Sequence, residues 1–317
     1  MASLDDSTLH GLSIALASAV ALAGCALQPS LGGATPRAAA EADRAAWHAQ
    51  RLETLSGPEG WLTLVALDFL DEGVQSIGRS PDCALRYQGA SADRIGSIEV
   101  VRADAAETDP RVVFTPEAGV ACELDGAPLS SPATLRSDAA GVPSALRNGS
   151  LLVTLVRRDG ALALRVRDRE SPVRTGFRSI ELFPFDPSRT LEARVEPPAP
   201  GERVAITNVR GFTELSPVAA RLAFTIDGAE HSLVATEGSN GRLFVVFADT
   251  TNGDETYGGG RFLDVAAPTA GRTTIDFNRA TNPPCAFTAF ATCPMPPAGN
   301  RLPVAIRAGE RAYGAAH

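Results

Sequence analysis

The chain has 317 residues, of which 44% are hydrophobic and 21% are charged, and its formal net charge at pH 7 is −8. This composition is that of a folded protein and excludes collagen-like repeats and a multispan membrane protein, while the negative charge argues against the basic face that nucleic-acid binding requires. All 29 basic residues are arginine, so the sequence excludes a Walker-type phosphate loop, a Schiff-base lysine and a protein-kinase site.

The N-terminal segment contains an apolar run from Gly11 to Ala23 that is too short to span a bilayer as a helix. The run ends in Leu22-Ala23-Gly24-Cys25, which resembles the lipobox of bacterial lipoproteins, a family in which the cysteine is acylated and becomes the first residue of the mature chain. An ordinary cleaved signal peptide with an incidental cysteine is the alternative. We therefore expect residues 1–25 to form a lipoprotein-type signal peptide with Cys25 lipidated, and residues 26–40 to form a flexible tether. The protein would then lie in the cell envelope, anchored to the membrane on its periplasmic or extracellular face.

A charged, alanine-rich segment follows the tether. The pattern from Arg37 to Leu55 predicts a helix that stops before Ser56-Gly57-Pro58, and we assign residues 41–58 to this helical segment. Trp47 is expected to anchor the helix to a β-domain.

Short apolar runs separated by turn residues begin at Gly60 and predict a first β-domain over residues 59–170. The clearest hairpin joins Leu151–Arg157 to Ala161–Arg167 through Asp159-Gly160, a dipeptide that readily takes the positive φ angles of a tight turn. In the second arm, apolar residues alternate with Ala163, Arg165 and Arg167, so one face is apolar and the other mostly basic. Asp125-Gly126 and Asp227-Gly228 are expected to form similar turns.

A proline-rich stretch after Ser171 predicts a domain boundary, because prolines at that density are poor central-strand residues. We expect residues 171–317 to form a second β-rich domain. Its strand candidates are Arg203–Thr207, Arg221–Ile226, Ser232–Ala235, Arg242–Ala248, Arg261–Val265, Thr273–Phe277 and Val304–Arg307.

Four cysteines remain if Cys25 is lipidated, namely Cys83, Cys122, Cys285 and Cys293. An even number of cysteines in an exported chain indicates up to two disulfides, with the pairing left open by the sequence. Cys285 and Cys293 are the favoured pair because they would close a proline-rich segment. The chain has no CxxC motif and only four histidines, so no metal site and no cofactor are expected.

Several motifs of the C-terminal half resemble those of a known family. They are Tyr257–Leu263, Asp276–Ala280, Asn282–Thr288 and Asn300–Pro303, with Gly60–Val65 as an earlier match. Together they resemble the signature of domain-of-unknown-function family 1684, and the resemblance extends over most of the chain from Trp47 to Glu310. It implies a family and not an activity.

The first β-domain also resembles a forkhead-associated domain. Ser76–Cys83 is similar to the opening of that fold, and Leu146–Leu151 is similar to the turn into one of its late strands. Forkhead-associated domains hold phosphothreonine with an arginine after the glycine and with a later Ser-x-x-His motif. Gly78-Arg79 is present here but the histidine motif is not, so phosphopeptide binding is not expected. The resemblance implies a mainly β fold: an N-terminal helix, a forkhead-associated-like β-sandwich and a second β-rich domain.

Polar residues concentrate in the C-terminal motifs, and we take Tyr257, Arg261, Asp276, Asn278 and Asn282 as candidate ligand-binding residues. We expect Arg261 and Asp276 to face each other beside a pocket whose backbone is made rigid by glycine and proline. Each acidic residue could equally be a structural cap or ion-pair partner.

Two functions are consistent with these observations. The first is a lipid-anchored envelope module that binds a small ligand or an envelope protein. The alternative is a hydrolase-like enzyme that uses the C-terminal carboxylates for acid–base chemistry. No nucleophile–base motif is recognisable in the sequence, so catalytic residues are not assigned.

If Cys25 is the acylation site, Cys25→Ser will release the protein from membranes or leave it unprocessed, because the thioether that carries the lipid cannot form. Membrane fractionation of the wild type and the variant measures this. Wild-type protein found wholly in the soluble cytosolic fraction would contradict the lipoprotein assignment.

Overall fold

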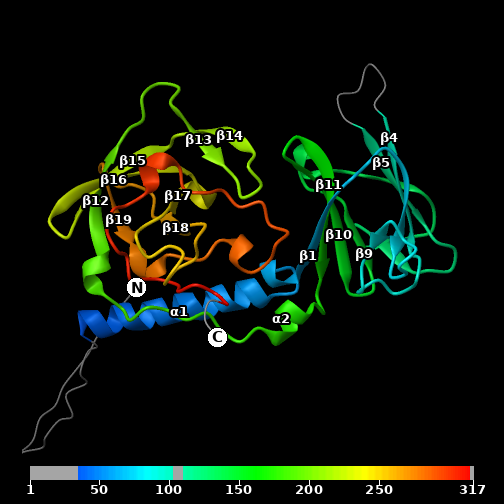
Figure 1. The fold of residues 1–317 in the computed structure, drawn as a ribbon, viewed down its shortest axis with the longest axis horizontal. Helices are drawn as coiled ribbons and strands as arrows, with labels where there is room; N and C mark the ends of the chain where they lie inside the picture. Colours follow the sequence, from blue (N-terminus) through cyan, green and yellow to red (C-terminus); the bar gives the residue numbers. More distant parts are fainter. Residues whose placement is uncertain (1–34, 103–109, 315–317) are drawn as a thin grey trace, which may run out of the picture.

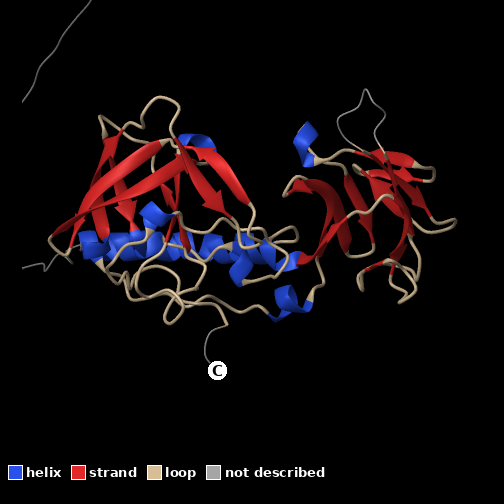
Figure 2. Ribbon diagram, turned by 45° about the horizontal axis from the view of Figure 1, so that its top comes forward, coloured by secondary structure: helices blue, strands red, loops and turns tan. Residues whose placement is uncertain are grey.

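The computed structural model describes residues 35–102 and 110–314, and Cys25 with its predicted lipid lies outside these residues. The chain is mainly β, with one long helix near its N-terminal end and several antiparallel sheets, which confirms the predicted fold class. Two β-domains stand side by side, and the long helix lies along the C-terminal one (Figures 1 and 2).

Helix α1 extends from Pro36 to Ser56. Thr35 caps its first turn, accepting a hydrogen bond from the Ala38 N–H, and Pro36 occupies a position where its missing N–H costs nothing. These two signals lie before residue 41, so the helix begins earlier than the predicted segment. It ends at Gly57-Pro58, because the residue before a proline disfavours helical geometry.

The N-terminal β-domain, residues 64–168, is a sandwich of two sheets. The larger sheet contains, in spatial order, β1 (Leu64–Phe69), β11 (Ala161–Asp168), β10 (Leu151–Arg158), β9 (Ala145–Asn148), β6 (Cys122–Leu124) and β7 (Ala127–Leu129). The smaller contains β3 (Leu85–Arg86), β2 (Gly73–Gly78), β4 (Gly96–Val101), β5 (Arg111–Pro116) and β8 (Ala133–Leu135). Buried aliphatic residues from both sheets, with Phe114 and Tyr87, fill the space between them.

The predicted hairpin is confirmed as β10 and β11. The two strands are antiparallel, with Leu151 opposite Asp168 at one end and Arg158 opposite Ala161 at the turn. Asp159 and Gly160 at its turn have φ of 52° and 80°. Leu162, Leu164 and Val166 point into the sandwich core, as the alternation predicts. Arg165 and Arg167 are therefore on the outer face of the sheet.

The C-terminal β-domain is built on a six-stranded sheet. Its spatial order is β18 (Arg261–Val265), β17 (Leu243–Phe247), β16 (Ala229–Glu237), β15 (Ala220–Ile226), β12 (Thr190–Glu196) and β19 (Arg272–Asp276), with β13 (Arg203–Thr207) and β14 (Thr213–Pro217) as a separate hairpin. Short helices connect the strands: η1 (Trp61–Thr63), η2 (Asp138–Ala140), α2 (Pro172–Gly176), η3 (Pro187–Arg189), η4 (Ser239–Gly241), η5 (Phe277–Arg279), η6 (Pro284–Ala286) and η7 (Ala298–Asn300).

In the C-terminal domain one predicted strand is wrong, and two strands, β12 and β14, were missed. Val304–Arg307 is irregular, because the backbone there bonds to buried side chains and not to a neighbouring strand: the Ile306 N–H donates to Asp249 and the Ile306 carbonyl accepts from Arg261. Strand β12 was missed because prolines flank it closely on both sides.

Helix α1 belongs structurally with the C-terminal domain, although the sandwich separates them in the sequence. Arg44 donates to the Phe183 carbonyl at 2.6 Å, and Arg51 donates to the Asn282 carbonyl at 2.9 Å. Arg51 also forms an ion pair with the fully buried Glu310 at 3.0 Å. In the sequence, the sandwich is thus inserted between α1 and the rest of the C-terminal domain.

Among residues 35–102 and 110–314, no helix is both long enough and apolar enough to cross a membrane.

Replacing Arg51 by methionine will destabilise the protein by about 3–5 kcal/mol, because the change leaves the Glu310 carboxylate buried without its cation. Urea unfolding gives the free energy. The matched control is Arg37→Met on the same helix, whose ion pair with Glu41 is exposed and should contribute less than about 1 kcal/mol. Equal effects of the two variants would contradict this role of Glu310.

Candidate functional site

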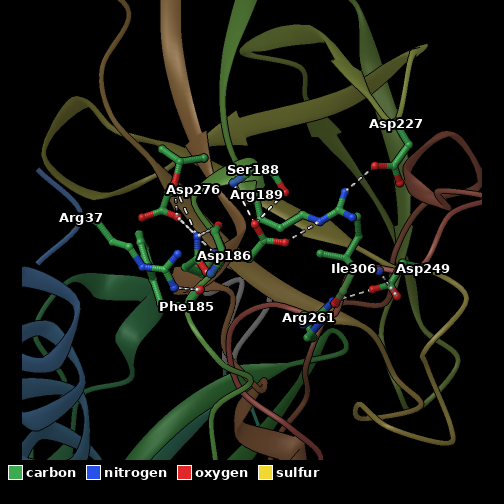
Figure 3. Close-up of polar contacts among 12 residues, drawn as sticks. Arg37, Phe185, Asp186, Ser188, Arg189, Asp227, Asp249, Arg261, Asp276 and Ile306 are labelled. Carbon is green, nitrogen blue, oxygen red and sulfur yellow. Dashed lines mark hydrogen bonds and ion pairs between the residues drawn. The ribbon is translucent and has the colours of Figure 1, made fainter. Parts of the chain in front are cut away.

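Arg261, predicted as a ligand-binding residue, is completely buried. Its guanidinium forms an ion pair with Asp249 at 2.6 Å and donates to the Ile306 carbonyl (Figure 3). It also donates to the Ala308 carbonyl. Its charge also lies over the ring of Phe247, 5.1 Å from the centroid. Burial lowers the pKa of Arg261, and the Asp249 carboxylate opposes that shift. Arg261 therefore has a structural partner and does not face Asp276.

Asp276 and Asn278 lie together at the end of β19. The Asp276 carboxylate accepts from the Thr190 hydroxyl and from the N–H and side-chain amide of Asn278, and it forms an ion pair with Arg279 at 3.4 Å. Asn278 is fully buried and exchanges hydrogen bonds with the backbone of Asp186. These contacts fix the turn into η5, so both side chains are accounted for by backbone satisfaction.

Asn282 is also fully buried and donates to the Arg311 carbonyl at 2.7 Å, while its own N–H donates to Glu310. It holds the C-terminal segment against the loop that follows η5. Arg261, Asn278 and Asn282 have no exposed surface, so the structure does not bring the predicted residues together around a solvent-filled cavity.

Tyr257 lies elsewhere, next to the two cysteines for which a disulfide was predicted. Its hydroxyl donates to the Cys285 carbonyl at 3.3 Å. Cys285 and Cys293 are adjacent but are free thiols in the structure, with the Cys285 N–H donating to the Cys293 sulfur at 3.1 Å. Cys83 and Cys122 are free as well.

A different feature of the chain has the form of a binding site. The outer face of the larger sandwich sheet carries a groove of about 440 Å³, which we call the arginine groove. Its floor consists of Leu152, Thr154 and Val156 on β10; Arg147, Arg165 and Arg167 on the neighbouring strands border it. A second groove of about 350 Å³ shares Arg147, Leu152 and Arg167 with it.

Two of these arginines have no anionic partner. Among the described residues, Arg165 and Arg167 form no salt bridge, and the Nε atom of each is buried without a hydrogen-bond acceptor. Both guanidinium groups lie near the ring of Trp61, with their Cζ atoms 5.9 and 6.0 Å from its centroid. Cation–π attraction to Trp61 partly stabilises the two guanidinium charges, but the buried Nε donors of both arginines still lack hydrogen-bond acceptors.

The carboxylates that border the groove are already paired. Glu59 forms an ion pair with Arg147 at 2.5 Å, and Asp138 forms one with Arg158 at 2.7 Å. Burial and the neighbouring positive charges of Arg158 and Arg167 lower the pKa of Arg165 to about 10. Burial lowers the pKa of Arg167 too. The Asp138 carboxylate opposes the shift at Arg165, and the Glu59 carboxylate opposes the shift at Arg167, but neither forms a salt bridge with these arginines. The positive charge of the groove is therefore only partly offset by its own carboxylates.

Sequence reasoning noted the basic face of this hairpin but gave it no function. The signal was the alternation of Arg165 and Arg167 with apolar residues; what the sequence could not show was that the nearby carboxylates pair with other arginines. No group of three or more histidine, cysteine, aspartate or glutamate side chains is placed to hold a metal ion in the described part of the chain.

Comparison with known proteins gives a family match but no activity. The family model described as "Protein of unknown function (DUF1684)" matches residues 175–311. The solution structure of an uncharacterised protein from gene locus rrnAC0354 of Haloarcula marismortui is 32% identical, with 45% of this chain and 81% of that chain covered and a TM-score of 0.38. No curated protein matches the chain.

Asp249→Ala will lower the free energy of unfolding by about 3–5 kcal/mol, because it strands the Arg261 charge in the core. Asp264→Ala is the control, since Asp264 is an exposed residue on the same strand as Arg261 and should change stability by no more than about 0.5 kcal/mol. Denaturant unfolding of both variants measures the difference. A stable Asp249→Ala protein would contradict a structural role for the pair.

Proposed function

We propose that the protein is a lipid-anchored envelope module that binds a small anionic ligand in the arginine groove. Residues 175–311 belong to the DUF1684 family, which carries no assigned activity. The proposal therefore starts from a site in the part of the chain outside these residues. The observation that carries this proposal is the pair of arginines, Arg165 and Arg167, that lack a carboxylate partner while their Nε donors are buried.

Unpaired cations at one place oppose folding, because each repels the other and loses hydration. The lowered pKa values of Arg165 and Arg167 agree with this, because they show that the native state disfavours the protonated form of each side chain. A bound anion with two or more negative charges would reverse the effect by accepting hydrogen bonds from both guanidinium groups. The groove volume of about 440 Å³ lies within the range typical of small-molecule sites, roughly 300–1,000 Å³.

The alternative of a hydrolase has less support. Its proposed residues do not share a cavity, since Arg261 and Asn278 are sealed in the core and the Asp276 carboxylate caps a turn. A carboxylate that is already occupied by three donors is a poor general base.

Pyrophosphate serves as the probe because it is small and carries several negative charges. We expect it to bind wild-type protein at fixed ionic strength, and Arg165→Gln or Arg167→Gln to weaken binding by about 10- to 100-fold, the effect of losing one charge-assisted hydrogen bond of about 1.5–3 kcal/mol. Isothermal titration calorimetry measures the affinity.

Arg102→Gln is the matched control, because Arg102 belongs to the same domain but is exposed and already paired with Glu72. It should leave the affinity unchanged. Without ligand, Arg165→Gln should not lower the melting temperature, since it removes a repelled charge. No saturable binding to the wild type, or equal losses in all three variants, would overturn the proposal.

A further inference from the structure

Cys285 and Cys293 lie where the two domains meet. They pack in one apolar cluster with Trp61 and Leu64, which lead into the sandwich, and with Phe262 of the C-terminal sheet. Cys293 is 3% exposed, whereas Cys285 is only partly buried. Cys285 is thus the more exposed residue of the pair.

The backbone around both cysteines is held in place from outside the segment. The Cys293 carbonyl accepts from the Val209 N–H at 3.0 Å, and the Cys285 carbonyl accepts from the Tyr257 hydroxyl at 3.3 Å. The Thr288 hydroxyl, between the cysteines, donates to the Leu64 carbonyl at 3.1 Å. A sulfur 3.1 Å from the Cys285 nitrogen can reach the Cys285 sulfur by side-chain rotation alone.

The two thiols also differ in acidity. The Cys293 S–H donates toward the Cys285 sulfur and lowers the pKa of Cys285 to about 7. The same hydrogen bond, together with burial, raises the pKa of Cys293 above its usual value. Of the two thiols, Cys285 is therefore the one that more readily forms the nucleophilic thiolate, while Cys293 keeps its proton.

We propose that Cys285 and Cys293 form a reactive dithiol that exchanges with disulfides, Cys285 as the attacking thiol and Cys293 as the resolving thiol. The Cys285 sulfur bonds to one sulfur of a small-molecule or protein disulfide, and the bond between the two sulfurs of that disulfide breaks. The other sulfur of that disulfide leaves as a thiolate and takes up a proton from water. The Cys293 sulfur then attacks the Cys285 sulfur, which forms the Cys285–Cys293 bond and expels the sulfur that Cys285 had bonded; the Cys293 proton passes to that sulfur, which leaves as the second thiol. Two thiols of this chain are oxidised and one disulfide is reduced to two thiols.

The other described cysteines lack this arrangement. Burial raises the pKa of Cys122, whose sulfur lies against the core and Asn148. Cys83 is partly exposed, but its thiol donates to the Asp93 carbonyl and has no second cysteine beside it. The dithiol and the arginine groove share the neighbour Trp61, which packs against the cysteines and lies near Arg165 and Arg167, but neither cysteine lines the groove.

Oxidised glutathione is the probe, added at pH 7 to full-length protein carrying Cys25→Ser and Cys83→Ser so that these thiols do not react. Mass spectrometry with peptide mapping follows the products. We expect the background protein to lose two thiols together and to give a Cys285–Cys293 disulfide. In addition, Cys293→Ser should accumulate glutathione on Cys285, and Cys285→Ser should react at least tenfold more slowly.

Glutathione that reacts equally fast at Cys293 in Cys285→Ser, or a background protein in which Cys285 and Cys293 both stay reduced, would overturn the proposal. The protein that carries only Cys25→Ser and Cys83→Ser retains both Cys285 and Cys293. If neither of these thiols is oxidised in it, the proposal is overturned even where Cys285→Ser or Cys293→Ser fails to fold. Pyrophosphate affinity, measured in parallel, is expected to be the same before and after reaction with glutathione, which separates this inference from the proposed function.

Discussion

The buried ion pair between Arg261 and Asp249 organises the C-terminal domain. It joins the first residue of β18 to the segment after β17, and the terminal nitrogens of Arg261 also donate to the carbonyls of Ile306 and Ala308. These bonds replace the ladder that a further strand would have supplied. Two residues beyond Ala308, Glu310 receives hydrogen bonds from Arg51 and Asn282. The segment from Ala308 to Glu310 thus links helix α1 to the buried ion pair.

Local patterns predicted the β10–β11 hairpin and most strands of the C-terminal domain, because their signals lie in adjacent residues. Asp159-Gly160 needs only its own φ angles to make a turn, and the alternation on β11 needs only period two. Val304–Arg307 shows the limit of such reasoning: its apolar pattern is that of a strand, but Arg261 and Asp249 satisfy its backbone from a distant part of the sequence. A hydrogen bond from a side chain that is distant in the sequence gives no signal in the neighbouring residues.

The candidate site was harder to predict for the same reason. Arg261 and Asp276 are both polar residues in a rigid, glycine- and proline-rich region, yet each has a structural partner contributed by a distant segment: Arg261 bonds to Asp249, and Asp276 to Thr190. Arg165 and Arg167 look like ordinary outward residues of a strand, and their lack of partners becomes visible only when Glu59 and Asp138 are seen paired elsewhere. The proposed function rests on two arginines that form no salt bridge, a feature that composition does not reveal.

The insertion of the sandwich between α1 and the remaining C-terminal domain has an evolutionary consequence. The first and last strands of the sandwich pair with each other, with Leu64 opposite Arg167, and the Ser171 hydroxyl donates to the Leu62 carbonyl at 2.7 Å. Entry and exit of the sandwich therefore lie side by side, the geometry that permits one domain to be gained or lost inside another without cutting a sheet. An ancestor consisting of the helix and the C-terminal sheet alone could have acquired the arginine-bearing module in a single recombination event, with its existing core left intact.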